Sequence, residues 1–215
     1  MVDQLKARKR AFTKDVVTKF LDDYLPINRR ENFKNHIQFR HINYTDEPEY
    51  LQDVDIACQN LLILAGEMKD FVLDKHKEKF LDIATRIGNI SKGGETSGLY
   101  PAFRRVCDEL FAEEVNWSHI TAFLLVAAEA QSHSRLDICQ PSLGRKIRRE
   151  YIDFVSDYLN DKCLSWIDSQ GGWSSLNTLV DLGAQGTLKS MRSYMSIAVL
   201  AACVAGFFIS KYTGN

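Results

Sequence analysis

The sequence has few of the residues that interrupt helices: four prolines and twelve glycines among 215 residues. Long runs in which β-branched and polar residues alternate, as they do in half-buried strands, are also absent. Hydrophobic residues nevertheless make up 45% of the chain and aromatic residues 11%, which suffices for a packed core and argues against wholesale disorder. Together these features predict a mainly helical globular protein.

Cysteine spacing and net charge exclude several further classes of protein. The five cysteines are an odd number, are widely spaced and include no CxxC pair. This pattern argues against a disulfide framework or a zinc site, so we expect a reducing compartment, no metal and no cofactor. The formal net charge of −1 provides no basic field that would attract nucleic acid.

Signals for catalysis are missing as well. The histidines are His36, His41, His76, His119 and His133. None of them lies in an HExxH sequence or beside a cysteine, and the glycine-rich segment 92–98 lacks the Gly-Lys-Ser/Thr ending of a phosphate-binding loop. We therefore expect no enzyme, and a histidine or cysteine with a strongly shifted pKa in a closed pocket would overturn this expectation.

Apolar residues at helical spacing predict an amphipathic helix over residues 5–25, which we expect Pro26 to end. Residues 26–52 are polar and irregular and predict a long loop. A second amphipathic helix is expected over residues 53–74, with an apolar stripe that could face its own domain or a partner's groove.

The second half predicts more helices, one of which is unusual. Further helices are expected over residues 77–87, 100–111, 120–128, 144–163, around Trp166, and over residues 174–182. In segment 120–128 every residue except Thr121 is apolar, so this helix must lie in the centre of a bundle or in a membrane. It is too short to span a membrane easily.

Residues 193–210 contain no charge and are flanked by basic residues. A helix of these 18 residues would be about 27 Å long, close to the roughly 30 Å of bilayer hydrocarbon. The segment predicts a marginal membrane-spanning anchor suited to the mitochondrial outer membrane, with the endoplasmic reticulum or a partly cytosolic state as alternatives. The other interpretation is a final helix packed in a groove of the domain. We thus expect a helical domain over residues 1–190 and an anchor over residues 191–215.

Four segments of the chain resemble the motifs of one known family. Residues 109–123, ELFAEEVNWSHITAF, are similar to the first homology motif of the Bcl-2 family, in which ELF is followed after three residues by VNWGR and an apolar helix. Residues 166–173, WIDSQGGW, are similar to the second motif, WI and GGW separated by three residues. The third motif is divergent and keeps its apolar anchors as Ala57, Leu61, Leu64 and Met68. Residues 15–25 resemble the fourth motif, and the C-terminal tail is similar to the family's anchor. The resemblance covers nearly the whole chain.

The resemblance implies an all-α, Bcl-2-like bundle of about eight helices around a central hydrophobic helix, followed by a C-terminal transmembrane helix. It implies a regulator of apoptosis that binds amphipathic helices of pro-apoptotic family members in a hydrophobic groove, facing the cytosol from the mitochondrial outer membrane. It is also compatible with a homo- or heterodimer. The implied groove residues are Met68, Val72, Val106, Glu109, Leu110, Asn116, Ser118, His119, Ala122 and Val126. A membrane-anchored bundle without a groove function is the structural alternative.

The sequence departs from the family pattern at both ends of one charged contact. The Gly-Arg of the first motif is replaced by Ser118 and His119, and the aspartate of the third motif is replaced by Gly66. Histidine lacks the five-donor fork of arginine, so the departure predicts weaker or altered peptide binding, although Asn116 could still bind the partner's acidic residue. We hypothesise that a groove-facing His119 binds that residue best when protonated; the alternative is a tolerated polar residue at the groove mouth.

Family members either protect cells by sequestering death-promoting helices or act as effectors that permeabilise the outer mitochondrial membrane. Two features favour a pro-survival protector here. The fourth motif is well formed, and Gly66 replaces the aspartate that effectors use when the helix of one protomer docks in the groove of another. The alternative is a Bax/Bak/Bok-like effector that oligomerises.

Overall fold

The computed structural model describes residues 2–28, 49–68, 103–104, 107–108, 110–133 and 141–184. Within these ranges the regular structure is helical and no strand occurs, as the sequence predicts. The long helices are α1 (Val2–Asn28), an unlabelled helix over residues 49–68, α5 (Trp117–His133), α6 (Pro141–Ser169) and α7 (Ser175–Ala184). The predicted count of about eight helices extends beyond the described residues.

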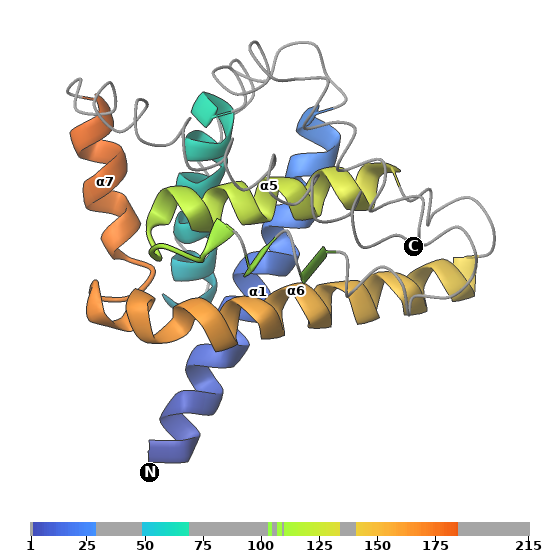
Figure 1. Cartoon of the computed structure of the whole chain (residues 1–215), viewed down its shortest axis with the longest axis horizontal. Coiled ribbons are helices and arrows are strands. Elements are labelled where there is room, and N and C mark those ends of the chain that lie inside the picture. The colour runs from blue at the N-terminus through green and yellow to red at the C-terminus, as the bar shows by residue number, and fades with distance from the viewer. Residues whose placement is uncertain are drawn as a thin grey trace.

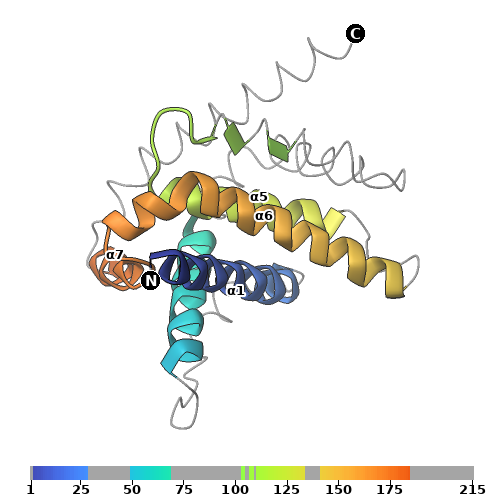
Figure 2. The ribbon, with the colours of Figure 1, turned by 90° about the horizontal axis from the view of Figure 1, so that it is seen from below.

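Helix α5 lies at the centre of the fold, because it has no polar face to turn toward water. Residues 117–130 are all buried, which confirms the central hydrophobic helix predicted from segment 120–128. Helix α6 runs beside α5, while α1 crosses both of them and its N-terminal turns extend beyond α6 (Figure 1). The view from below shows the helix of residues 49–68 crossing α1 (Figure 2).

Helix α1 contributes to the core through one face. This inner face of α1 consists of Val16, Val17, Phe20, Leu21 and Tyr24, each at most 1% exposed. The residues recur at helical spacing, so they form the single apolar stripe expected of an amphipathic helix. The part of the helix that resembles the fourth homology motif is therefore the part that packs in the interior.

Two predicted boundaries near α1 are wrong. Helix α1 continues two residues past Pro26 to Asn28, because a proline in the last turn removes only one backbone hydrogen bond and leaves the following N–H groups able to bond. The next helix already includes Glu49, four residues before the predicted Asp53, so the loop predicted over residues 26–52 is shorter at both ends.

Helix α6 is longer than the sequence predicts. It begins at Pro141 rather than Gly144 and continues to Ser169, so Trp166 belongs to α6 and no separate helix forms around it. The prediction of a separate helix placed a boundary between two apolar stripes that are continuous in the structure. Gly171 and Gly172 follow with φ of +97° and +82°, and α7 then forms close to the predicted residues 174–182.

An ion-pair ladder joins α1 to α6 along the surface. The ladder, here called the α1–α6 seam, consists of Lys9–Asp168, Arg10–Asp161, Lys14–Asp153 and Asp22–Arg148. Because residue numbers rise along α1 while those of the partners fall along α6, the two helices are antiparallel across the seam. All of these side chains are at least one-third exposed.

Several predictions lie outside the described residues. These are the end of the second helix at residue 74, the helix over residues 77–87, the loop over residues 92–98 and the tail helix over residues 193–210. The division into a domain of residues 1–190 and an anchor of residues 191–215 therefore stays a prediction. Among the helices that the structure describes, none is both long and apolar enough to cross a membrane.

Candidate groove site at the start of α5

The candidate site is built around the turn that starts α5. Asn116 caps this helix: its side-chain Oδ1 accepts the backbone N–H of His119 at 2.8 Å, and its carbonyl accepts the N–H of Ile120 at 3.0 Å. Asparagine is among the preferred N-cap residues, and removing such a cap typically costs about 1 kcal/mol. The Asn116 side-chain amide also donates to the Glu114 carboxylate at 2.6 Å. Both the oxygen and the nitrogen of the Asn116 side-chain amide are thus hydrogen-bonded within the chain.

His119 is buried beneath the turn rather than presented to solvent. The residue is only 4% exposed. Its Nδ1 lies 2.9 Å from the carbonyl oxygen of Glu114, and its ring lies edge-on to the ring of Phe111. Because a carbonyl oxygen only accepts hydrogen bonds, Nδ1 must carry the proton. In the neutral ring Nε2 is then an acceptor, so neutral His119 cannot replace an arginine fork that binds a carboxylate.

The predicted groove residues come from three segments of the chain and share one core. Met68, Leu110, Ala122 and Val126 belong to the same buried apolar cluster, and each is at most 7% exposed. Ser118 is also buried, at 8% exposure. A partner helix that touched these side chains would have to displace atoms of this chain that now shield them from water.

Four of the predicted groove residues differ from this buried group. Asn116 is only half-buried, in keeping with its position at the end of α5. Val72, Val106 and Glu109 lie outside the described residues. The structure thus places seven of the ten predicted residues, and the groove that they would form stays a prediction.

The tryptophans of the first two homology motifs form one cluster below the site. Trp117 at the start of α5 lies 5.3 Å from Trp166 and 5.5 Å from Trp173, measured between ring centroids. The indole N–H of Trp173 donates to the hydroxyl of Thr13 in α1 at 3.3 Å. The cluster thus joins α1, α5 and the end of α6 at one helix junction.

The glycines of the second motif end α6. The N–H of Gly172 donates to the carbonyl of Ile167 at 2.9 Å, and the N–H of Gly171 donates to that of Asp168 at 3.1 Å. This pair of bonds is the Schellman arrangement, which requires a residue with positive φ after the helix. Glycine meets that requirement without strain, and the turn it permits brings Trp173 back onto α1.

A buried carboxylate in α5 was missed by the sequence analysis. Glu129 is 3% exposed and accepts the hydroxyl of Tyr24 at 2.8 Å. Burial raises the pKa of Tyr24 well above its usual range, and the Glu129 carboxylate raises it further. The available signal was a tyrosine on the inner face of α1, since a buried phenol usually finds a hydrogen-bond partner.

The titratable groups offer no recognisable catalytic or metal arrangement in the described part of the chain. No group of three or more His, Cys, Asp or Glu side chains is placed there to hold a metal ion. Cys58, Cys107 and Cys163 are free and buried. Burial raises the pKa of each of these thiols, to about 12 for Cys163, so they are poor nucleophiles near neutral pH.

Comparison with known proteins points to one family. The model of the Bcl-2 family of apoptosis regulator proteins matches residues 66–173, half of the chain. Apoptosis regulator R1 of Xenopus laevis is 28% identical over 175 residues, covering 76% of this chain and 71% of that protein. Bcl-2-like protein 1 of Gallus gallus is 25% identical over 139 residues, covering 63% of this chain and 55% of that protein. The chain thus spans about half the length of the latter relative.

Solved structures share the same fold. The crystal structure of chicken BOK has a TM-score of 0.56 at 17% identity, with 81% of this chain and 98% of that chain covered. Trichoplax adhaerens trBcl-2L2, solved bound to the trBak BH3, has a TM-score of 0.52 at 17% identity, with 80% and 99% covered. Since the family model covers half of the chain and its motifs form the helix junction described above, this protein belongs to the Bcl-2 family of apoptosis regulators.

Proposed function

We propose that this protein is a pro-survival member of the family that binds amphipathic helices of pro-apoptotic relatives at the mitochondrial outer membrane. The observation that carries the proposal is that Met68, Leu110, Ala122 and Val126 all belong to the hydrophobic core, to which three segments of the chain bring them. These residues come from three segments and supply the row of apolar contacts that a helix needs in a groove. The Trichoplax relative of the same fold was solved with such a helix, the trBak BH3.

The pro-survival sign rests on two sequence features that favour a protector over an effector. Its fourth-motif segment supplies the whole inner face of α1, and Gly66 stands where an effector's third motif has aspartate. Without that aspartate, the third-motif helix of this chain should bind poorly in the groove of a second copy. It can still receive the helix of another protein.

Binding should require the site to open. The apolar side chains of the site are buried, so part of the binding free energy is used to uncover them, and association should be slower than for a preformed groove. The missing arginine adds a second cost, because leaving one partner of a buried charged pair unmatched typically costs about 2–5 kcal/mol. We therefore expect affinities below those of family members with an intact charged contact.

The direct test is calorimetry with the chain shortened by residues 190–215, after its cooperative unfolding has been checked. A panel of third-motif peptides from pro-apoptotic family members is titrated, each beside a peptide whose apolar anchors are replaced by alanine. Sub-micromolar binding of several intact peptides and none of the controls supports the proposal. Failure of every peptide to bind would contradict it.

His119 allows a sharper test of the same site. Protonation would convert its Nε2 from an acceptor into a donor, so affinity for a peptide with the acidic residue should rise as the pH falls from 7.5 to 5.5. A peptide with asparagine in place of that aspartate is the control and should bind equally at both pH values. Equal affinity of the aspartate peptide across this range would remove His119 from the contact.

The alternative function is that of an effector that permeabilises the outer mitochondrial membrane. The observation in its favour is the burial of the groove residues, which leaves the site closed at rest. Liposomes with the lipid composition of that membrane distinguish the two functions. Release of an entrapped dye by the full-length chain supports the effector, whereas suppression of the release caused by a known effector supports the protector.

A further inference from the structure

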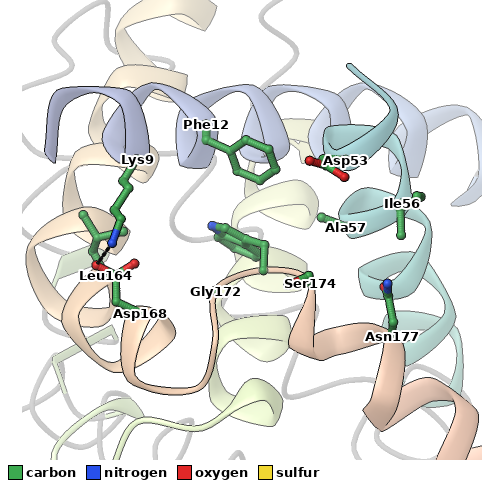
Figure 3. Close-up of a pocket in the computed structure, with 11 residues that line it drawn as sticks. Lys9, Phe12, Asp53, Ile56, Ala57, Leu164, Asp168, Gly172, Ser174 and Asn177 are labelled. Carbon is green, nitrogen blue, oxygen red and sulfur yellow. Dashed lines mark ion pairs between the residues drawn. The ribbon is translucent and has the colours of Figure 1, made fainter. Parts of the chain in front are cut away.

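A pocket of about 240 Å³ lies between the ends of several helices (Figure 3). It is bounded by α1, the helix of residues 49–68 and the turn that joins α6 to α7. None of the predicted groove residues lines it. Small-molecule sites usually have volumes of about 300–1,000 Å³, so this pocket is suited to a single long side chain rather than to a larger ligand.

Two aromatic rings form the walls of the pocket. Phe12 of α1 and Trp173 after α6 both line it, and the Phe12 ring points into the space between the helices in Figure 3. Both rings are held in place, since Phe12 packs edge-on against Tyr50 at 5.4 Å and the indole of Trp173 donates to Thr13. The walls are therefore preorganised, which reduces the cost of ordering them around a guest.

The two carboxylates that line the pocket differ in their ion pairs to the described residues. Asp168 is neutralised by Lys9, whose Nζ lies 2.8 Å from its carboxylate. Asp53, on the helix of residues 49–68, is exposed and forms no ion pair with any residue that the structure describes. Its carboxylate lies beside the Phe12 ring in Figure 3, so the pocket combines an aromatic ring with a carboxylate that no cation of the described residues neutralises.

Exposed apolar side chains extend from the pocket. Among the described residues the large hydrophobic side chains that are exposed are Leu5, Tyr50 and Leu51. Leu5 precedes Lys9 by four positions on α1, and Tyr50 precedes Asp53 by three on the next helix, so both lie on the helix faces that line the pocket. They add apolar surface on the two helices that a partner bound at the pocket could cover.

We propose that this pocket is a second docking site, which takes an arginine side chain of a partner peptide. The guanidinium would lie against the rings of Phe12 and Trp173 and pair with Asp53, while Tyr50 and Leu5 contact apolar residues beside it. Arginine fits both features, because its flat cation stacks on aromatic rings and binds carboxylates. An apolar side chain in the same place would remove water from Asp53 without replacing its hydrogen bonds.

The test follows the indole N–H signal of Trp173 by NMR in the ¹⁵N-labelled full-length chain. The probes are the N-acetyl, N-methylamide derivatives of arginine, lysine and leucine. We expect a saturable shift with the arginine derivative, with binding tighter than that of the lysine derivative and much tighter than that of leucine. A leucine derivative that binds as tightly as arginine, or no saturable shift with any probe, overturns the proposal.

Two variants localise the binding. Asp53→Asn should weaken the arginine derivative about threefold or more, the upper range for an exposed charge pair. Asp181→Asn is the matched control, because Asp181 is an exposed aspartate on α7 with no ion pair to the described residues, and it should bind as the parent does. Phe12→Leu keeps an apolar wall but removes the ring, so it should abolish the preference for arginine over lysine. Equal affinities of the Asp53 and Asp181 variants would contradict the site.

Discussion

Helix α1 is held on two sides by different forces. Along the α1–α6 seam it is joined by ion pairs whose side chains remain a third or more exposed, such as Lys14–Asp153 at 49% and 43%. Along its inner face the side chains are almost completely removed from water. Exposed pairs are weakened by hydration and salt, whereas burial of apolar area is not. The comparison teaches that the inner face supplies the stability, and that the seam mainly sets the register of α1 on α6.

The largest effect expected is loss of stability at alkaline pH. The buried thiols of Cys58, Cys107 and Cys163 keep their protons in the fold because burial raises the pKa of each, to about 12 for Cys163. An unfolded thiol ionises near pH 8.5, so stability is fully present below about pH 8.5 and falls as the pH rises further. Each thiol should contribute a decline of about 1.4 kcal/mol per pH unit.

Urea denaturation at pH 8, 9 and 10 measures this decline. Cys163→Ala should reduce the decline in the free energy of unfolding by the contribution of one thiol. Because the substitution also removes packing, it should lower the free energy of unfolding by a further amount that is the same at all three pH values. A free energy of unfolding that stays constant from pH 8 to 10 would show that the interior is wetter than the structure indicates.

Truncation on the inner face should be the most damaging single substitution. Phe20→Ala removes a ring that is fully buried and stacked on Tyr24, and such substitutions typically cost about 3–5 kcal/mol. The matched control is Leu5→Ala on the same helix, where the side chain is 56% exposed, and we expect less than about 0.5 kcal/mol. Similar losses in the two variants would contradict the distinction between the two sides of α1.

The polar contact within the inner face should be worth less. Tyr24→Phe removes the hydroxyl that donates to the buried Glu129 at 2.8 Å, which should cost about 1–3 kcal/mol because a buried acceptor loses that donor. Tyr50→Phe is the control, since its hydroxyl donates at 2.7 Å to Asp15 at the exposed surface, and its loss should cost less. Thermal or urea unfolding compares the two. A double-mutant cycle with Glu129→Gln then isolates the buried pair.

The smallest effect should come from the seam. Lys14→Met removes the charge that pairs with Asp153 but keeps the apolar stem, and we expect a change of less than about 1 kcal/mol. Addition of 1 M NaCl should reduce the stability of the parent chain by more than that of this variant. Lys146→Met, which breaks a longer contact of 3.8 Å within α6, is the control and should be close to neutral. A loss above about 2 kcal/mol for Lys14→Met would reverse the ranking of the two sides.

Periodicity predicts the fold well where burial decides the structure, and poorly where single backbone groups decide it. The central position of α5 follows from its composition, because a helix without a polar face must be buried on all sides. The boundary errors at Pro26 and at Glu49, which already lies in the second helix, arise because a few backbone hydrogen bonds lengthen a helix without changing its apolar pattern. The separate helix predicted around Trp166 has another cause, since the apolar stripe of α6 continues through that residue.

The residues of the candidate site could be predicted from the sequence, but their hydrogen bonds and their burial could not. Motif resemblance identifies Asn116 and His119, and the preference of asparagine for N-cap positions is compatible with the cap that Asn116 forms on α5. No sequence signal tells that His119 donates from Nδ1 to the Glu114 carbonyl. Nor does the sequence tell whether the apolar residues of the site are open or buried, since both arrangements use the same pattern. These properties depend on contacts between segments that are distant in sequence.

The contact between Thr13 and Trp173, which are separated by 160 positions, has a consequence for synthesis of the chain. Helix α1 leaves the ribosome early, whereas its partners in α6 and the α6–α7 turn follow more than 120 residues later. At translation rates of about 5–20 residues per second, the inner face of α1 waits on the order of ten seconds for them. During that interval its apolar side chains are available to other proteins, so we expect the nascent chain to be more prone to association than the completed fold.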